Sequence, residues 1–211
     1  MNRPEGLATD RSMMRRCIAL SGSSGRQGEY PYAAVICRNG EFVCDSINRV
    51  ASDRDVTRHA EVVAICDAQK ILGSTSLDDC TLYTNAEPCA FCCYAIRESR
   101  IGRVVYGMRS PVMGGHSRWN ILADDGLSNA MPEVFAPPPE IVAGYLRDEA
   151  ADVLKAWNPL VWRFIKARGL LAVDADHERA GLPDTFRRRR MWERVMIVFR
   201  RTVADRFGRM L

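Results

Sequence analysis

Apolar and polar residues follow two different periods along the first half of the chain. Apolar positions recur at helical spacing in three segments, at about 8–20, 57–72 and 89–98. Shorter apolar runs, which are typical of β-strands, lie at 33–37, 42–47, 81–84 and 103–106. Asn39 and Gly40 separate the first two runs, and this dipeptide favours a tight hairpin. The order of these elements predicts an α/β fold, in which helices pack on the faces of a mixed sheet.

Small residues and prolines mark the breaks between these elements. The serines and glycines from 21 to 25 are expected to end the first helix. The proline run 137–139 precedes a pattern that predicts one long helix from about 140 to 167. We therefore expect one domain over residues 1–130 and a helical C-terminal extension over residues 131–211.

The end of the chain differs from the rest in charge. The whole sequence carries a formal net charge of +4, and residues 178–211 hold ten arginines against four acidic residues. Apolar residues recur among these arginines at near-helical spacing, which predicts a cationic amphipathic helix. Packing on the domain or on a second copy is the first interpretation, nucleic acid binding the second and a membrane surface the third.

Composition places the chain among ordinary globular proteins. Its 211 residues are 47% hydrophobic and 27% charged, which argues against a disordered, collagen-like or coiled-coil protein. No apolar run approaches the roughly 20 residues that cross a bilayer, and the polar start at Met1 lacks a secretory signal. We expect a soluble cytoplasmic protein with no membrane partner.

Eight cysteines raise the question of disulfides or metal. In a chain of this length without an export signal, reduced thiols and a metal site are the expected use. His59, Cys89 and Cys92 offer one imidazole and two thiolates, a donor set that suits zinc. Three protein ligands leave a fourth position for water, whose pKa zinc lowers to roughly 7. The sequence thus predicts an open, catalytic Zn²⁺ site. Cys93 is not expected to be a ligand, because on a helix it points about 100° away from Cys92, and it is expected to be a buried thiol.

Glu61 follows His59 by two residues on the same predicted helix. Such residues point roughly 200° apart, so Glu61 is not expected to bind the metal. It is better placed to face the bound water as the catalytic proton carrier of a hydrolytic deaminase. His59-Ala60-Glu61 together with Pro88-Cys89-Ala90-Phe91-Cys92 resembles the signature of the cytidine and deoxycytidylate deaminase superfamily.

The resemblance extends over about residues 8–125. Segments similar to the branch of bacterial guanine deaminases and tRNA adenosine deaminases lie at 31–36, 58–61, 82–84, 87–89 and 100–107. It implies a three-layer α/β/α cytidine deaminase-like fold with a five-stranded sheet, and a homodimer. It also implies that Asn48 hydrogen-bonds the substrate ring and that the backbone N–H of Ala60 holds a ring or carbonyl acceptor. The alternative for Asn48 is a turn residue that caps the hairpin.

Two later residues are further candidates for substrate binding. Trp119 could stack on a heterocycle, or fill the space under a loop as an aromatic plug. Asp125 could accept a hydrogen bond from an amino-substituted ring, or belong to a solvated Asp-Asp-Gly turn.

Three hypotheses follow for function. The first is a zinc-dependent aminohydrolase of a free nucleobase or related amino-heterocycle, guanine-type rings first, which releases ammonia. The second is a tRNA adenosine deaminase whose basic tail holds phosphates. The third is a zinc-stabilised binding module without turnover, against which Glu61 argues because a structural zinc site has no use for an unligated carboxylate.

Overall fold

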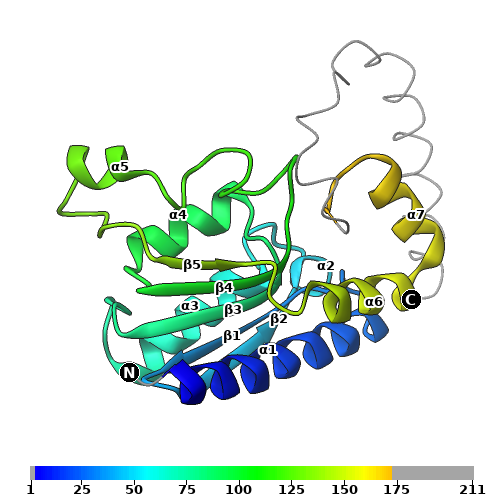
Figure 1. Cartoon of the computed structure of the whole chain (residues 1–211), viewed down its shortest axis with the longest axis horizontal. Helices are drawn as coiled ribbons and strands as arrows, with labels where there is room; N and C mark the ends of the chain where they lie inside the picture. Colours follow the sequence, from blue (N-terminus) through cyan, green and yellow to red (C-terminus); the bar gives the residue numbers. More distant parts are fainter. Residues whose placement is uncertain (1–2, 173–211) are drawn as a thin grey trace, which may run out of the picture. The chain divides into compact units, whose positions relative to one another are not determined.

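The computed structural model describes residues 3–172 (Figure 1). Its strands are β1 Ala33–Arg38, β2 Glu41–Ile47, β3 Cys80–Ala86, β4 Arg103–Met108 and β5 Glu140–Ala143. Its helices are α1 Arg3–Arg26, α2 Val50–Asp53, α3 Ala60–Leu72, α4 Ala90–Glu98, α5 Asp125–Ala130, α6 Arg147–Trp157 and α7 Pro159–Ala167. The strands form one five-stranded sheet in the order β2-β1-β3-β4-β5. β1 is antiparallel to β2 and β3, whereas β3, β4 and β5 are parallel.

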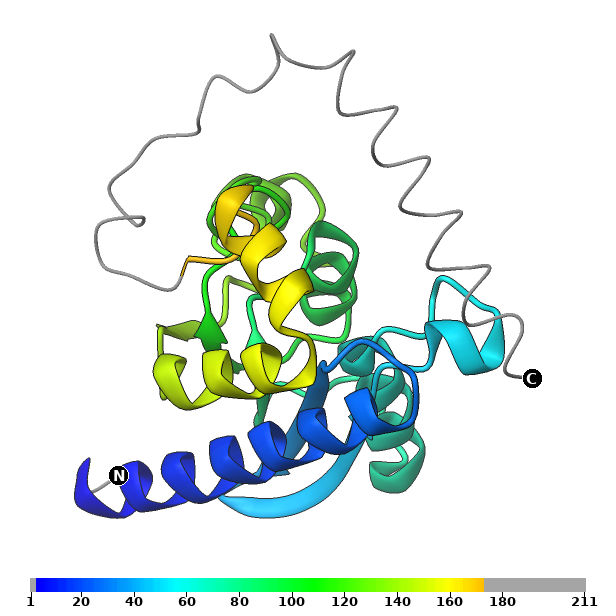
Figure 2. The same ribbon diagram turned by 90° about the vertical axis from the view of Figure 1, so that its right-hand side faces the viewer.

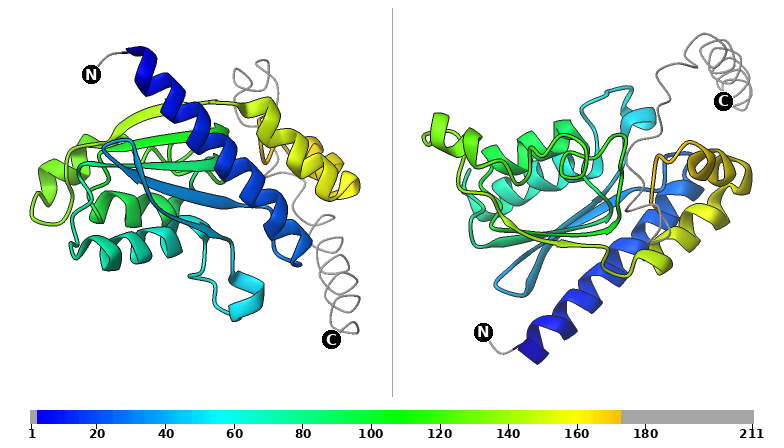
Figure 3. Two further views of the ribbon diagram at one scale, coloured as in Figure 1. Left: turned by 90° about the horizontal axis from the view of Figure 1, so that it is seen from below. Right: turned by 45° about the horizontal axis from the view of Figure 1, so that its top comes forward.

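Helices cover both faces of the sheet, which confirms the predicted three-layer fold (Figures 2 and 3). Successive side chains of a strand point to opposite faces. On β1, Ala34 and Ile36 pack under α3 and α4, while Val35 and Cys37 pack under α1 and α6. Each face therefore has its own apolar core.

The hairpin between β1 and β2 is confirmed at the predicted dipeptide. Asn39 and Gly40 both have positive φ, 51° and 86°. A two-residue turn with this backbone matches the twist of the two strands it joins, and Asn and Gly adopt it at little cost.

The prediction that the first helix ends at residues 21–25 is wrong, because α1 continues to Arg26. The two glycines of this run, Gly22 and Gly25, face α6. A methyl group at Gly25 would lie 2.5 Å from Cδ1 of Trp157, and the indole N–H of Trp157 donates to the Gly25 carbonyl at 3.2 Å. Ser21 bonds back to the Ile18 carbonyl at 2.8 Å. Tertiary packing therefore uses as a helix face a run that composition alone marks as a loop.

The prediction of one helix over 140–167 is also wrong. Residues 140–143 form β5, which pairs with β4 from Arg103↔Glu140 onward. The remainder is broken between α6 and α7 at Asn158, whose side chain accepts from the N–H groups of Leu160 and Val161, with Pro159 in the first turn. This is a helix start, since proline lacks the N–H that an interior position needs.

Two further predictions concern the end of the chain. The basic amphipathic helix expected over 178–211 lies outside the described residues. The division into two domains at residue 130 stays a prediction. The first long-range pairing after that residue is made by strand β5, where one long helix was expected. Within residues 3–172 no helix is both long and apolar enough to span a membrane.

Candidate metal centre and active site

The predicted site residues gather at one edge of the sheet. β2 and β3 run in the same direction, so their carboxyl ends lie together; Asn48 follows β2, and Cys89 follows β3 after a two-residue connection. In the loop that joins β2 to α3, the N–H of Arg49 donates a hydrogen bond of 2.9 Å to the Arg58 carbonyl and so brings the two ends of the loop together. This bond draws His59 toward the same edge. Carboxyl ends of strands are where sheets of this class form their sites.

His59, Cys89 and Cys92 bring their ligand atoms together. The Cys89 and Cys92 sulfurs lie 3.6 Å apart, and Nδ1 of His59 lies 3.6 Å from the first and 3.3 Å from the second. A tetrahedral zinc ion with Zn–S bonds of about 2.3 Å and a Zn–N bond of about 2.0 Å separates its ligand atoms by roughly 3.5 to 3.8 Å. The three side chains therefore fit such an ion, and within residues 3–172 they are the one group of metal-binding side chains this compact.

Two helix starts meet at these ligands. His59 is the N-cap of α3 and Cys89 is the N-cap of α4, each in extended conformation and each without a side-chain cap. Unpaired N–H groups and the positive end of the helix dipole favour a thiolate at this place. The hydrogen bond from Cys92, assisted by His59 and opposed by burial, lowers the pKa of Cys89 to about 4.

Glu61 lies beside the ligands without being one of them. Its carboxylate is nearly buried, 8% exposed, and Oε2 lies 3.5 Å from the sulfur of Cys92. Burial, with the nearby Cys89 thiolate, raises the pKa of Glu61. A carboxyl group whose pKa is raised holds and returns a proton more readily than an ordinary one, which suits the predicted proton carrier.

Comparison with known proteins decides the family. The family model of the cytidine and deoxycytidylate deaminase zinc-binding region matches residues 7–108. The tRNA-specific adenosine deaminase of Bacillus subtilis (strain 168) is 31% identical over 152 residues, covering 72% of this chain and 89% of that protein. The chain belongs to the cytidine and deoxycytidylate deaminase family. This confirms the resemblance seen in the motifs, and with it zinc as the cofactor and hydrolytic C–N bond cleavage as the chemistry.

Relatives of this deaminase differ in substrate. The guanine deaminase of Bacillus subtilis (strain 168) is 46% identical over 96 residues, covering 45% of this chain and 62% of that protein. A structure from a study of A-to-I editing by tRNA:A34 deaminases superposes with a TM-score of 0.62 at 30% identity, covering 68% of this chain and 99% of that one. The chain spans only 10% of the chloroplastic tRNA(adenine(34)) deaminase of Arabidopsis thaliana and 25% of the tRNA(Ile)-lysidine synthase of Deinococcus radiodurans.

Glu87, two residues before the metal ligand Cys89, holds the loop after β4 in place, a role that the motif alone does not reveal. Its carboxylate accepts hydrogen bonds from the N–H groups of Ser110 at 2.7 Å and His116 at 3.0 Å, and from the N–H and hydroxyl of Ser117. Gly114 packs so closely that a Cβ would overlap this carboxylate. The loop after β4 is thereby clamped against the Cys89 segment.

Of the predicted substrate-binding residues, Asn48 and Ala60 lie at the site. Ala60 is the first residue of α3, between His59 and Glu61, and is 1% exposed. Asn48 is 5% exposed, and its backbone N–H donates to the Tyr32 carbonyl at 3.0 Å. Their contacts with substrate stay a prediction.

Trp119 and Asp125 are placed differently. Trp119 is 57% exposed on the loop clamped by Glu87, with the guanidinium of Arg118 5.1 Å from its ring centre. Asp125 begins α5 and is exposed, and α5 is tied to Arg97 near the far end of α4 through Ser128. Arg97 follows Cys89 by eight residues, or about 12 Å of helix. The structure therefore does not bring Asp125 to the metal ligands.

Cys93 takes a structural place, as expected, and so does His116. The Cys93 thiol is fully buried and bonds to the Pro88 carbonyl at 3.5 Å. His116 lies with Nδ1 2.9 Å from the Tyr106 hydroxyl. All eight cysteines are free of disulfides.

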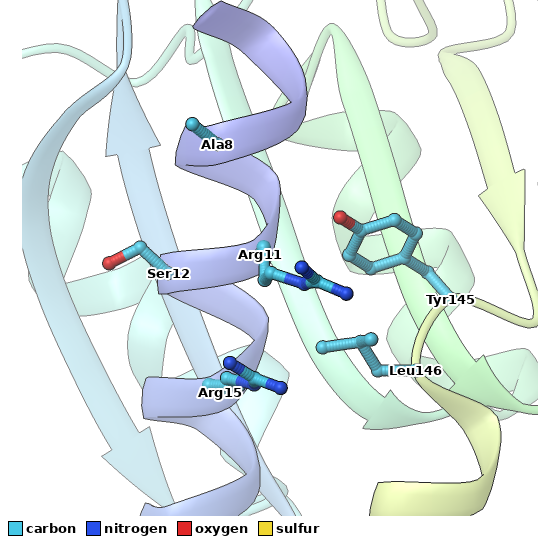
Figure 4. A pocket seen from close by; sticks show the side chains of 6 residues that line it. All are labelled: Ala8, Arg11, Ser12, Arg15, Tyr145 and Leu146. Carbon is cyan, nitrogen blue, oxygen red and sulfur yellow. The ribbon is translucent and has the colours of Figure 1, made fainter. Parts of the chain in front are cut away.

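A cavity of about 820 Å³ lies on the other face of the sheet. Its lining comes from α1 and from the connection between β5 and α6, and Arg11 projects from α1 toward Tyr145 (Figure 4). None of its lining residues is a predicted site residue. Arg15, on its wall, is paired with Glu149 at 3.1 Å. This cavity is separate from the metal ligands.

Proposed function

We propose that this deaminase acts on a free nucleobase or a related amino-heterocycle, with a guanine-type ring as the first candidate. The observation that carries the proposal is the course of the chain after α7. The N–H of Ala172 donates to the Arg109 carbonyl at 2.8 Å, and the hydroxyl of Ser110 donates to the Leu170 carbonyl at 2.9 Å. Arg109 and Ser110 directly follow β4, so this segment is tied to the edge of the sheet that holds the metal ligands. A segment held at this edge supports a small substrate that enters whole.

Burial at the site supports the same substrate class. Glu61 is 8% exposed, and Cys92 and Ala60 are each 1% exposed. Groups this deep are reached by a compact ring, and the exclusion of bulk water strengthens their electrostatic effect on it. The identity of 46% to a guanine deaminase over 96 residues is a second support for a guanine-type ring.

Each residue has a defined task in the proposed reaction. Zinc held by His59, Cys89 and Cys92 supplies Lewis acidity that makes water a nucleophile at neutral pH. Glu61 takes a proton from the attacking water and passes it to a ring nitrogen. It then takes the second proton from the hydroxyl now on the ring carbon and gives it to the amino group, which leaves as ammonia. Asn48 and the N–H of Ala60 orient the ring. The oxygen of water becomes the carbonyl oxygen of the product, so the net reaction consumes one water and releases one ammonia.

The test is ammonia release from a panel of cytosine, adenine, guanine, aminotriazines, pterins and nucleosides. We expect turnover of a free amino-substituted ring, guanine first, by the zinc-loaded protein. Glu61→Gln is the control, because it keeps the size and position of the side chain and removes its proton transfer. Turnover of none of the free rings would refute the proposal.

The second candidate is adenosine deamination in tRNA. It is favoured by the Bacillus subtilis tRNA-specific adenosine deaminase, 89% of whose length this chain matches. The arginine-rich segment 178–211 would then contact phosphates, which makes binding salt-sensitive. Formation of inosine in a tRNA transcript, together with no activity on free rings, would establish this alternative.

A homodimer is proposed for the assembly. Large apolar side chains remain exposed along α4 and on the loop after β4: Phe91 (46%), Tyr94 (45%), Met113 (57%) and Trp119 (57%). Exposed apolar side chains of this size support burial against a second copy. Light scattering after size exclusion should give twice the chain mass of 23.7 kDa; a monomer at micromolar concentration would contradict it. The cytoplasmic location stays a prediction.

A further inference from the structure

Glu29 is a buried carboxylate that the reaction described above does not use. It lies in the connection between α1 and β1, a segment with no motif, and is 3% exposed. Its Oε2 accepts from Nδ2 of Asn48 at 3.0 Å and from the N–H of Ala51 at 3.2 Å, and its Oε1 accepts from the N–H of Ser52 at 2.7 Å. A carboxylate from one segment thus holds both a candidate substrate-binding side chain and the start of α2.

The backbone around Glu29 is itself fixed. Its N–H donates to the Ser24 carbonyl at 3.3 Å, and the hydroxyl of Ser24 donates to the Tyr30 carbonyl at 2.9 Å. The ring of Tyr30 packs against Trp157 at 5.8 Å between ring centres. Glu29 is therefore anchored by α1 and α6, and its carboxylate does not adjust freely to Asn48.

Glu29 remains an acceptor at neutral pH. Burial acts to raise its pKa, but the donors from Ser52, Ala51 and Asn48 outweigh burial and hold the pKa of Glu29 below its usual value. An ionised carboxylate has no hydrogen to donate. The Asn48 amide must therefore turn its NH₂ group toward Glu29.

This contact fixes the other end of the Asn48 amide. With Nδ2 directed at Glu29, the carbonyl oxygen Oδ1 points away from it, and no group among residues 3–172 donates to Oδ1. Asn48 lies at the edge of the sheet that carries the metal ligands, since its neighbour Arg49 is bonded to Arg58, the residue before His59. Asn48 thus has a fixed orientation near the site, and its Oδ1 is an acceptor without a donor among the described residues.

We propose that Glu29 is a positioning residue that fixes Asn48 with Oδ1 toward the substrate, so that the site selects rings presenting an N–H donor there. The inference rests on the proposed substrate class. Amino-heterocycles with a ring N–H or an exocyclic amino group beside Asn48 satisfy Oδ1. Rings that present only an acceptor leave two acceptors facing each other, and a buried acceptor without a donor costs binding.

The competing explanation is that Glu29 only caps α2. Four proteins separate the two: wild type, Glu29→Gln, Asn48→Ala and the double variant, each zinc-loaded. Glutamine at 29 can donate to Oδ1 and so release Asn48 from its fixed orientation. KM and kcat are measured with the ring of the panel that wild type turns over fastest, or with a tRNA transcript if no ring is turned over. Substrate identity thus decides the proposed function, and the four-way comparison decides the role of Glu29.

The expected result is a KM that rises about tenfold in Glu29→Gln, as the loss of one oriented hydrogen bond implies, with kcat within about twofold. In the Asn48→Ala background the same change should alter KM less than about twofold. An equal rise in both backgrounds, or an unchanged KM in Glu29→Gln, would overturn the proposal. If melting temperature and zinc content show that Glu29→Gln does not fold, Glu29→Asp replaces it. Its carboxylate is one methylene short of Asn48, so the same rise in KM is expected and the same results would overturn the proposal.

Discussion

Thiols at the edge of the sheet and thiols in its interior behave as two different chemical groups. The bond from Cys92 lowers the pKa of Cys89 to about 4, whereas burial raises the pKa of Cys37 to about 12 and that of Cys44 to about 11. Cys37 and Cys44 lie on strands among apolar side chains, while Cys89 lies at a helix start beside an imidazole and a second sulfur. Environment, rather than residue type, decides which cysteines can bind metal.

The largest expected effect separates these two groups by mutation. Cys89→Ser removes a ligand that the other two side chains cannot replace, so we expect zinc content near zero and activity below detection. Cys44→Ser, the matched change in the interior, should keep both. Elemental analysis and ammonia release measure the pair. Equal zinc content in the two variants would mean that the edge thiols are not the metal site.

The next effect concerns the acid beside the edge thiols. Glu61→Gln should lower kcat by about 10² to 10⁴-fold, the usual contribution of a positioned proton carrier, and leave zinc bound. The readout is kcat with zinc content measured on the same sample. Loss of zinc together with activity would show instead that Glu61 helps to hold the metal.

Thiol reactivity in zinc-depleted protein should show the contrast directly. Because its pKa is lowered from 9.0 to about 4, Cys89 is a thiolate at pH 6, whereas Cys37, with its pKa raised to about 12, is protonated. Iodoacetamide at pH 6 should therefore modify Cys89 at least tenfold faster than Cys37. Peptide mapping by mass spectrometry measures both rates, and similar rates would refute the difference in environment.

The smallest effect belongs to the interior. Cys44→Ala removes a buried sulfur that bonds to the Ala64 carbonyl at 3.4 Å, and should lower the free energy of unfolding by about 1 kcal/mol. Zinc content and kcat should stay at wild-type values. Urea denaturation measures the change. A loss of activity at unchanged stability would give Cys44 a function that its place in the core does not predict.

Local patterns predicted what local chemistry determines. The Asn39-Gly40 turn, the strands on either side of it and the helices that begin beside His59 and Cys89 all follow from residues close together in sequence. The three metal-binding side chains were predictable for the same reason, since their spacing puts each at a helix start. The place of Glu61 beside the metal ligands, without being one of them, was predictable because it follows His59 by two residues on the same helix.

Long-range packing determined what the sequence could not reveal. The small residues at 21–25 form a helix because Trp157, far along the chain, packs on Gly25. Residues 140–143 form a strand because β4 is available to pair with them. Asn158 and Pro159 did carry a local signal, a cap followed by a first-turn proline, that could have divided the predicted long helix. Glu29 acts through partners more than ten residues away and carries no such signal.

X-ray absorption at the zinc edge of the purified, active protein tests the central claim most directly. The account predicts one zinc per chain, bound by two sulfurs at about 2.3 Å and one nitrogen at about 2.0 Å, with the fourth position filled by an oxygen from solvent. A fourth ligand from the protein, or a preparation that is active without zinc, would contradict it.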